Sequence, residues 1–237
     1  MDHPEPSRPT LGVRDGLSYA LFLPEERPTV GVVVLHGAGS AKESHFGFAR
    51  AAQTLGMAAL CFDMRGHGRS EGRFGPTAFA DVLIMADVLR EHAPAIALRG
   101  SSMGGFCAIQ AAAIEPTTAA VVAICPAPED FLLRGLREGR FEFEVDERPT
   151  EMWLESLSTR RAVASLAGRT ALLLLHAKGD EQVPYAVSEE LHGHAGEPKR
   201  LLLLPGGHHR SVQHDPELQE VSLRFIARAA RGAAGPR

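Results

Sequence analysis

The chain has 237 residues, of which 44% are hydrophobic and 23% are charged, and its formal net charge is −4. This length fits one domain with a full core, and the composition is typical of a water-soluble globular protein rather than a disordered or membrane chain. The charge balance offers neither a basic surface for nucleic acid nor a polybasic stretch for anionic lipid. We therefore expect a small-molecule partner.

The N-terminal residues and the cysteines indicate the cellular compartment. Residues 1–10 lack the basic start and apolar core of a secretory signal, and no apolar run approaches the ~20 residues that span a bilayer. Cys61, Cys107 and Cys125 each lie in an apolar run, which is typical of buried free thiols rather than of disulfides or metal ligands. We predict a cytoplasmic protein without membrane attachment.

The apolar runs predict the strands of a sheet. The segments LGVRDG and LSYALFLP, at 11–16 and 17–24, indicate an antiparallel pair at the sheet edge. Short runs that are apolar at every position follow at 31–36, 57–62, 95–98, 120–125, 170–176 and 200–205. Such runs are typical of parallel strands that helices cover on both faces.

Between these runs lie segments that predict helices. They have helix-favouring residues with apolar positions three and four apart, at 45–56, 77–93, 106–115, 185–195 and 217–230. The alternation of strand and helix predicts an α/β domain with a mostly parallel central sheet and right-handed crossovers. We expect residues 1–237 to form this single domain.

The segment 127–168 breaks the alternation. It contains FLLRGLREG, the charged FEFEVDE and the amphipathic TEMWLESL where a short connection would suffice. Segments of this length in compact domains are often lids or binding loops. We predict a short lid insertion whose Phe131, Phe141 and Trp153 line a substrate pocket. The alternative is a surface excursion that packs its own aromatic side chains.

The stretch RGSSMGG, at 99–105, lies between a predicted strand and a predicted helix. The spacing GxSxG is met only with Ser102 at its centre, because Gly100 and Gly104 lie two residues to either side. A sharp strand-to-helix turn strains its central residue, exposes that side chain and needs small neighbours. Ser102 is therefore a candidate nucleophile, and the N–H of Met103 at the helix start can face an oxyanion.

A serine nucleophile needs a base and a group that orients the base. Asp180 follows one predicted strand, and His208 and His209 follow the next, at the sheet edge where open α/β sheets place their sites. Asp180 is therefore a candidate acid, and the position after the strand leaves both His208 and His209 open as the base.

Together these motifs resemble the α/β-hydrolase superfamily, and the sequence is most similar to its bacterial esterase and serine aminopeptidase-like branch with small lids. The resemblance runs through LHGAGS, DMRGHGRSEG, RGSSMGG, HAKGDEQVP and GGHHR, in that order. It implies the α/β-hydrolase fold and a second oxyanion donor at the backbone N–H of Ala38. The family pattern also favours His209 as the base, with His208 as the alternative, and Asp180 as the acid, with Asp130, which follows the strand before, as the alternative. It gives the turn that contains Asp63 and His67 a structural role.

The resemblance further implies a Ser-His-Asp triad that works without a cofactor, and we predict a serine hydrolase that cleaves small-molecule carboxylic esters. An acyltransferase, a thioesterase or an aminopeptidase-like hydrolase would use the same triad, and a non-catalytic binding protein could share the fold. We expect no metal at HHRSVQHD, at 208–215, because no second ligand cluster or CxxC accompanies it. The sequence carries no signal for an oligomeric state.

Overall fold

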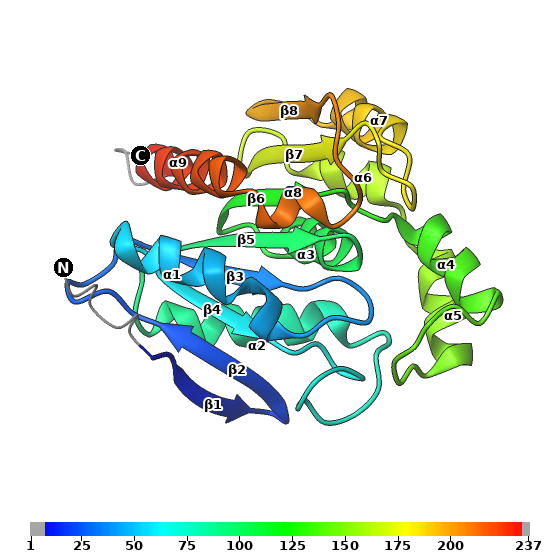
Figure 1. Cartoon of the computed structure of the whole chain (residues 1–237), viewed down its shortest axis with the longest axis horizontal. Coiled ribbons are helices and arrows are strands. Elements are labelled where there is room, and N and C mark those ends of the chain that lie inside the picture. The colour runs from blue at the N-terminus through cyan, green and yellow to red at the C-terminus, as the bar shows by residue number, and fades with distance from the viewer. Residues whose placement is uncertain (1–7, 234–237) are drawn as a thin grey trace.

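The computed structural model describes residues 8–233, which form an eight-stranded sheet in the order β1-β2-β4-β3-β5-β6-β7-β8 (Figure 1). The strands are β1 (Thr10–Arg14), β2 (Leu17–Phe22), β3 (Val30–Leu35), β4 (Ala58–Phe62), β5 (Ala95–Ser101), β6 (Thr118–Ile124), β7 (Ala171–Ala177) and β8 (Lys199–Leu204). At one edge β2 pairs antiparallel with both β1 and β4. The remaining neighbours, in the order β4-β3-β5-β6-β7-β8, all pair parallel. This confirms the predicted strands and the mostly parallel sheet.

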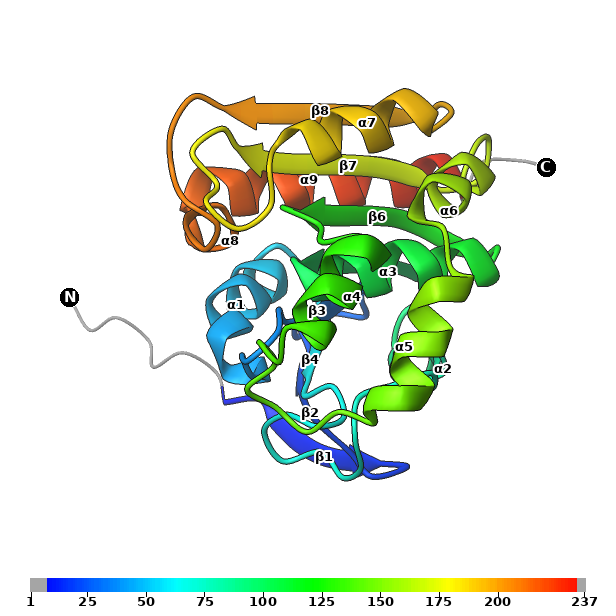
Figure 2. The same ribbon diagram turned by 90° about the vertical axis from the view of Figure 1, so that its right-hand side faces the viewer.

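Helices cover both faces of the sheet (Figures 1 and 2). They are α1 (Phe46–Thr54), α2 (Ala78–Arg90), α3 (Met103–Ile114), α4 (Glu129–Arg137), α5 (Glu147–Ser156), α6 (Thr159–Ser165), α7 (Ala186–His194), α8 (Ser211–His214) and α9 (Pro216–Ala233). Buried residues of α2, α3, α6 and α7 pack against one face, and those of α1, α8 and α9 against the other. The central strands β3 and β4 are apolar and buried at every position because both faces of the sheet are covered there.

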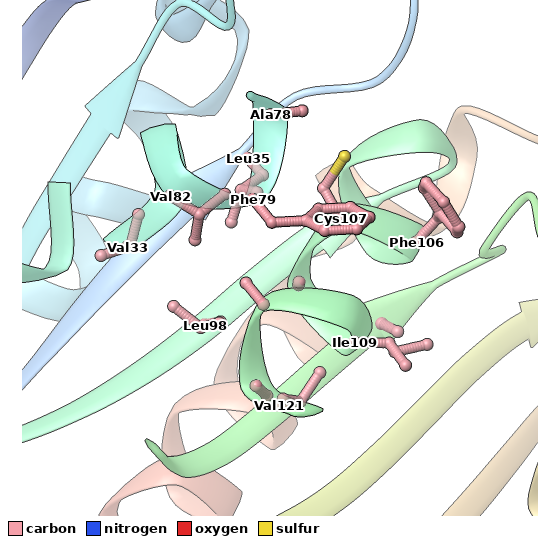
Figure 3. Packing of buried hydrophobic residues seen from close by; sticks show 14 of the residues in the cluster. Val33, Leu35, Ala78, Phe79, Val82, Leu98, Phe106, Cys107, Ile109 and Val121 are labelled. Atoms are coloured by element: carbon pink, nitrogen blue, oxygen red, sulfur yellow. The ribbon is translucent and has the colours of Figure 1, made fainter. Parts of the chain in front are cut away.

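The larger core layer lies between the sheet and helices α2 and α3. Figure 3 shows Val33, Leu98 and Val121 of three neighbouring strands beneath the two helices. The ring of Phe79 from α2 meets that of Phe106 from α3 edge to face, with centroids 5.7 Å apart. Full burial of such side chains contributes roughly 1.5–3 kcal/mol each, so this layer holds the first residues of α3 firmly.

The predicted insertion divides into two parts. Helix α6 packs between α3 and α7 and so belongs to the layer on the sheet. Helices α4 and α5 instead lie beyond the carboxyl ends of the strands (Figure 1), and we call residues 129–156 the cap. The two ends of the cap lie side by side. The Glu129 carboxylate at its start accepts hydrogen bonds from the backbone N–H of Thr159, at 2.9 Å, and from the Thr159 hydroxyl, just after its end.

Two further expectations concern the membrane and the cysteines. In the described part of the chain, none of the helices combines the length and the apolar character needed to cross a bilayer. Cys61, Cys107 and Cys125 are all free and buried, as the sequence predicts. Burial raises the pKa of each thiol well above its ordinary value, so these side chains are uncharged.

Candidate active site

Ser102 lies on a sharp turn between β5 and α3. Its φ of 53° and ψ of −119° are far from both strand and helix values, and such backbone strain is concentrated at functional sites. The turn depends on glycine. A Cβ on Gly100 would lie 2.1 Å from the Gly104 carbonyl oxygen, and one on Gly104 would lie 2.5 Å from that of His36. Strand, turn and helix therefore approach one another at backbone distance.

The loop after β3 lies directly beside Ser102. A Cβ on Gly37 would lie 3.4 Å from Cβ of Ser102. In this loop the N–H of Gly39 donates to His67 Nε2 at 3.2 Å and that of Ser40 to the Gly37 oxygen at 3.3 Å. The Ala38 N–H makes no hydrogen bond to another described residue. It is therefore available to a ligand beside Ser102, as is the N–H of Met103 at the start of α3.

Asp180 and His209 meet at the same edge of the sheet, on the loops after β7 and β8. His209 Nδ1 lies 2.7 Å from Asp180 Oδ2, and the other carboxylate oxygen accepts from the N–H groups of Gln182 and Val183, each at 2.9 Å. The two loops touch through their backbones, since a Cβ on Gly179 would lie 2.4 Å from the Gly207 oxygen. With Nδ1 donating to the carboxylate, Nε2 of His209 is the nitrogen left to accept a proton.

Known proteins share this fold. A family model described as "Serine aminopeptidase, S33" matches residues 26–131. Est1E from Butyrivibrio proteoclasticus superposes with a TM-score of 0.74 at 18% identity, over 97% of this chain and all of Est1E, and it has also been determined with ferulic acid bound. A monoacylglycerol lipase from Paleococcus ferrophilus superposes with a TM-score of 0.69 at 21% identity, over 91% of this chain and 98% of the lipase.

Residues 26–131 thus match a serine aminopeptidase family model, and the chain has the α/β-hydrolase fold. Curated proteins that are similar to it include YfhR of Escherichia coli K12, described as uncharacterized, which is 26% identical over 228 residues. That match covers 87% of this chain and 73% of YfhR. The matched family segment ends in α4, so Asp180 and His209 lie outside it.

The alternative acid and base lie away from the Asp180 and His209 pair. His208 is exposed, and its backbone N–H donates to the hydroxyl of Ser211 at 2.9 Å. Asp130 is exposed in the first turn of α4, where its carboxylate accepts from the N–H of Phe131 at 3.0 Å. The structure thus pairs Asp180 with His209, and neither alternative residue takes part in that pair.

The turn at 63–70 contacts the loop after β3 and holds it in place. Asp63 is fully buried and accepts from the Lys42 ammonium at 2.5 Å and from the Arg69 N–H at 2.9 Å. His67 accepts from Gly39 and stacks on Phe143 of the cap, with ring centroids 4.0 Å apart. Burial is the largest cause that lowers the pKa of His67, which keeps the imidazole neutral and able to accept. These contacts agree with the structural role expected for Asp63 and His67.

A contact between β5 and α8 was not foreseen. Ser101 Oγ donates to Gln213 Oε1 at 2.5 Å, and the buried guanidinium of Arg99 donates to the Gln213 carbonyl oxygen at 3.0 Å. Both side chains point to the same side of β5, and Gln213 follows His209 by four residues. The strand that carries the candidate nucleophile thus holds the segment that carries the candidate base. The pairing of Ser101 with the amide of a distant glutamine leaves no mark in the local sequence.

Cys125 is a second neighbour that the sequence did not reveal as part of the site. It directly follows β6 with a φ of 43°, and its Sγ, an Asp180 oxygen and a His209 nitrogen all lie within 4.8 Å of one another. Cys125 is 1% exposed, and burial is the largest cause that raises the pKa of its thiol. The group beside the carboxylate is therefore an uncharged thiol.

The three predicted pocket residues occupy different places in the cap. Trp153 of α5 packs on Phe79 of α2, with ring centroids 4.8 Å apart, and so anchors α5 to the helix layer on the sheet. Phe141 stacks on Phe143 at 4.7 Å. Phe131 lines a cavity of about 140 Å³ with residues of α6 and α7. The cap therefore does pack its own aromatic side chains, and a role of the three residues in binding substrate remains a prediction.

Proposed function

We propose that this α/β hydrolase is a serine hydrolase that cleaves carboxylic esters of small molecules. The observation that carries the proposal is the bond of 2.7 Å between His209 Nδ1 and Asp180 Oδ2, on loops at the same edge of the sheet as the strained Ser102. A serine, a histidine and a carboxylate in these roles form the catalytic triad of acyl-transfer enzymes. Esterase and lipase structures among the similar proteins support the ester class.

The proposed reaction has two steps. His209 Nε2 takes the proton of Ser102 Oγ as the oxygen attacks the ester carbonyl, and the same imidazolium then protonates the leaving alcohol. Water, deprotonated by His209, releases the acid and restores the serine. Asp180 holds the imidazole with its hydrogen on Nδ1 and stabilises the imidazolium.

The negative charge of the tetrahedral intermediate needs its own donors. The N–H groups of Ala38 and Met103 are proposed to supply them, because neither is consumed by the fold around Ser102. These donors belong to a loop and a helix start that are held by buried contacts, so they need not rearrange as the charge develops. No cofactor takes part in this scheme.

The substrate class follows from the walls of the site and from the similar proteins. Phe131, Phe141 and Trp153 of the cap are proposed to contact the acyl or alcohol group, since ligand pockets are mostly apolar. Est1E binds ferulic acid, and another similar structure is a monoacylglycerol lipase. We propose acyl esters of short or medium chain, with aromatic esters as the second class. We also propose a cytoplasmic location, because three free thiols are typical of a reducing compartment.

Labelling with a fluorophosphonate probe tests the nucleophile. The wild type should gain the mass of one probe, and Ser102→Ala should not. Ser101→Ala is the matched control, because its hydroxyl is committed to Gln213, and this variant should still be labelled. Ser102→Ala should also lower turnover by roughly four to six powers of ten at unchanged thermal stability. Labelling of Ser102→Ala, or its retention of more than about a hundredth of wild-type turnover, would refute the proposal.

A substrate panel tests the reaction class. Nitrophenyl esters of rising chain length, hydroxycinnamate esters, acyl thioesters and aminoacyl anilides should be compared at equal concentration. The proposal expects ester hydrolysis to exceed anilide hydrolysis by at least a hundredfold. Addition of alcohols as acceptors separates hydrolysis from acyl transfer, and dominant transfer to alcohol would make the protein an acyltransferase on the same triad.

A further inference from the structure

Asp180 is in contact with a second imidazole besides that of His209. His176, four residues earlier at the end of β7, places its Nε2 3.2 Å from Asp180 Oδ2, the oxygen that His209 also contacts. His176 and the carboxylate of Asp180 are both fully buried. The sequence marks this histidine only as the polar residue that ends an otherwise apolar strand.

The partners of His176 determine where its ring carries hydrogen. Nε2 lies 2.9 Å from the carbonyl oxygen of Val183, which can only accept, so Nε2 must donate. Nδ1 lies 2.7 Å from the hydroxyl of the buried Ser188 on α7, which can donate to it. A neutral ring with hydrogen on Nε2 satisfies every contact. The hydrogen lies toward the Val183 oxygen, and Asp180 Oδ2 lies 3.2 Å from the same nitrogen. The Val183 N–H in turn donates to Asp180 Oδ1 at 2.9 Å.

We infer that His176 is a positioning residue of the proposed triad: it donates from Nε2 to Asp180 Oδ2, fixes the carboxylate and shares its negative charge with His209. The inference rests on the proposed function. Oδ1 accepts from two backbone N–H groups, and Oδ2 accepts from His209 and lies 3.2 Å from His176 Nε2, so rotation of the carboxylate would break three hydrogen bonds and this contact at once. Second partners that orient metal-binding side chains commonly change activity by about 10–100-fold when removed, and we expect an effect of similar size for a carboxylate that orients a proposed base.

The charge balance at Asp180 agrees with this arrangement. Burial by itself raises the pKa of Asp180, but hydrogen bonds from His176, His209 and the two backbone N–H groups outweigh it and hold the pKa well below its ordinary value. The other ionisable neighbours are Cys125, which is uncharged, and Glu181, whose carboxylate accepts from the backbone N–H of His209 at 3.1 Å. Lys178 on the same loop extends over the ring of Tyr185, 5.8 Å from its centroid.

The shared carboxylate predicts the direction of a pH effect. Each hydrogen bond to Oδ2 disperses part of its charge, so the donor from His176 weakens the stabilisation of the His209 imidazolium. Removal of that donor should favour the imidazolium, and His209 would stay protonated to higher pH. The acidic limb of the kcat/KM profile should therefore move to higher pH. If His176 had a purely structural role, its replacement would lower activity or stability but would not move the acidic limb to higher pH.

Two substitutions test the inference. His176→Phe keeps an aromatic ring but removes the donor, and His176→Gln can place an amide N–H near the position of Nε2. We expect His176→Phe to lower kcat about 10–100-fold with little change in KM. Its acidic limb should move upward by about half to one pH unit. His176→Gln should restore most of both. His192→Phe, at a histidine outside the site, is the matched control and should leave the limb in place.

A second readout is available if a His176 variant no longer hydrolyses ester at a measurable rate. In the Ser102→Ala background, the midpoint of the His209 ring-proton titration by NMR should be higher with His176→Phe than without it, and circular dichroism should verify the fold of each variant. An unchanged or lowered midpoint, or an unmoved acidic limb, would overturn the role of His176. Absence of probe labelling and ester turnover in the wild type would instead overturn the proposed function, so the two failures can be told apart.

Discussion

The turn at Ser102 and the cap lie at the same edge of the sheet but are held in different ways. The turn depends on backbone packing, since Gly100 and Gly104 admit no Cβ without overlap with main-chain atoms. The cap depends on side chains, with Trp153 packed on Phe79 and exposed ion pairs from Arg137 to α5. Backbone packing tolerates almost no change, whereas side-chain packing can be rebuilt with other residues of similar volume.

The two kinds of packing correspond to two tasks of the proposed site, chemistry and substrate selection. The proposed nucleophile and its oxyanion donors belong to the part that tolerates almost no change, which suits chemistry that requires positions accurate to a fraction of an ångström. The proposed walls of the substrate pocket belong to the part that tolerates change. Substitutions in the turn should therefore abolish activity on all esters alike, whereas those in the cap should change which esters are cleaved. The following predictions test that contrast.

The largest effect is expected for Gly104→Ala. The new Cβ would lie 2.5 Å from the His36 oxygen and 2.6 Å from that of Leu35, so β3 and α3 would have to separate. We expect a loss of unfolding free energy at or above the ~1–3 kcal/mol typical of overpacked sites, measured by urea denaturation. Gly47→Ala in α1 is the control, since nothing lies within 4 Å of its Cβ. Equal stability of the two variants would contradict the importance of the close approach.

Trp153→Ala tests the cap. The side chain is only partly buried, so we expect a loss of about 2–3 kcal/mol, below the 3–5 kcal/mol of a fully buried tryptophan. The activity should change unequally across the ester panel, mainly in KM, because the turn at Ser102 remains intact. Phe79→Leu, which keeps the apolar contact from below, is a milder comparison. A uniform fall in kcat for every ester would show that the cap and the turn are not separable.

His36 allows a test by pH at the loop beside Ser102. Burial is the largest cause that lowers its pKa, to about 4. The neutral ring donates from Nδ1 to the Gly37 oxygen and accepts on Nε2 from the Met64 N–H at 3.0 Å. Because the unfolded chain binds this proton near pH 6.5 and the folded protein only near pH 4, stability should fall as pH drops through that window.

Linkage gives a loss of about 2 kcal/mol between pH 7 and pH 5 from His36 alone. His36→Gln, whose amide oxygen can accept from Met64, should flatten the pH dependence of unfolding free energy by up to about 1.4 kcal/mol per pH unit. Urea denaturation at several pH values measures this slope. A slope identical to that of the wild type would mean that His36 is already charged in the folded protein.

The smallest effect is expected at the rim of the cap. Arg137 pairs with Glu151 at 2.7 Å and with Glu155, but all three side chains are 40–51% exposed. Exposed ion pairs contribute little to stability, so Arg137→Ala should lower the melting temperature by no more than about 2–4 °C and leave ester turnover within about twofold. Thermal denaturation at low and high salt checks both the size and the electrostatic origin. A larger loss would show that ion pairs, and not the aromatic contacts, hold the cap.

The sequence predicts the sheet well because burial on both faces leaves a strong local signal. Each parallel strand is a short run of apolar residues, and GxSxG requires its glycines at fixed positions. The cap was harder to predict, because the segment 127–168 contains both the two cap helices and α6 of the sheet layer, and amphipathic patterns do not show which surface a helix covers. The short α8 was missed because a single helical turn carries no periodicity.

The site was predictable only where its residues lie at strand ends. Asp180 and His209 follow strands, and the structure brings them within hydrogen-bond distance. The contacts of His176, Cys125 and Gln213 join segments far apart in the chain, and each residue has an ordinary place in its own segment. Such partners follow from strand order and loop packing, which a single sequence does not encode locally.

The closed base of the cap has a consequence for engineering. Because Glu129 and Thr159 bind each other, the 29 residues between them leave and re-enter the fold through one narrow joint. A segment with such closely spaced ends can be exchanged between homologous scaffolds with few new junctions to satisfy. Grafting of caps from esterases of similar fold at this joint would alter the proposed substrate walls and leave the proposed catalytic residues in place.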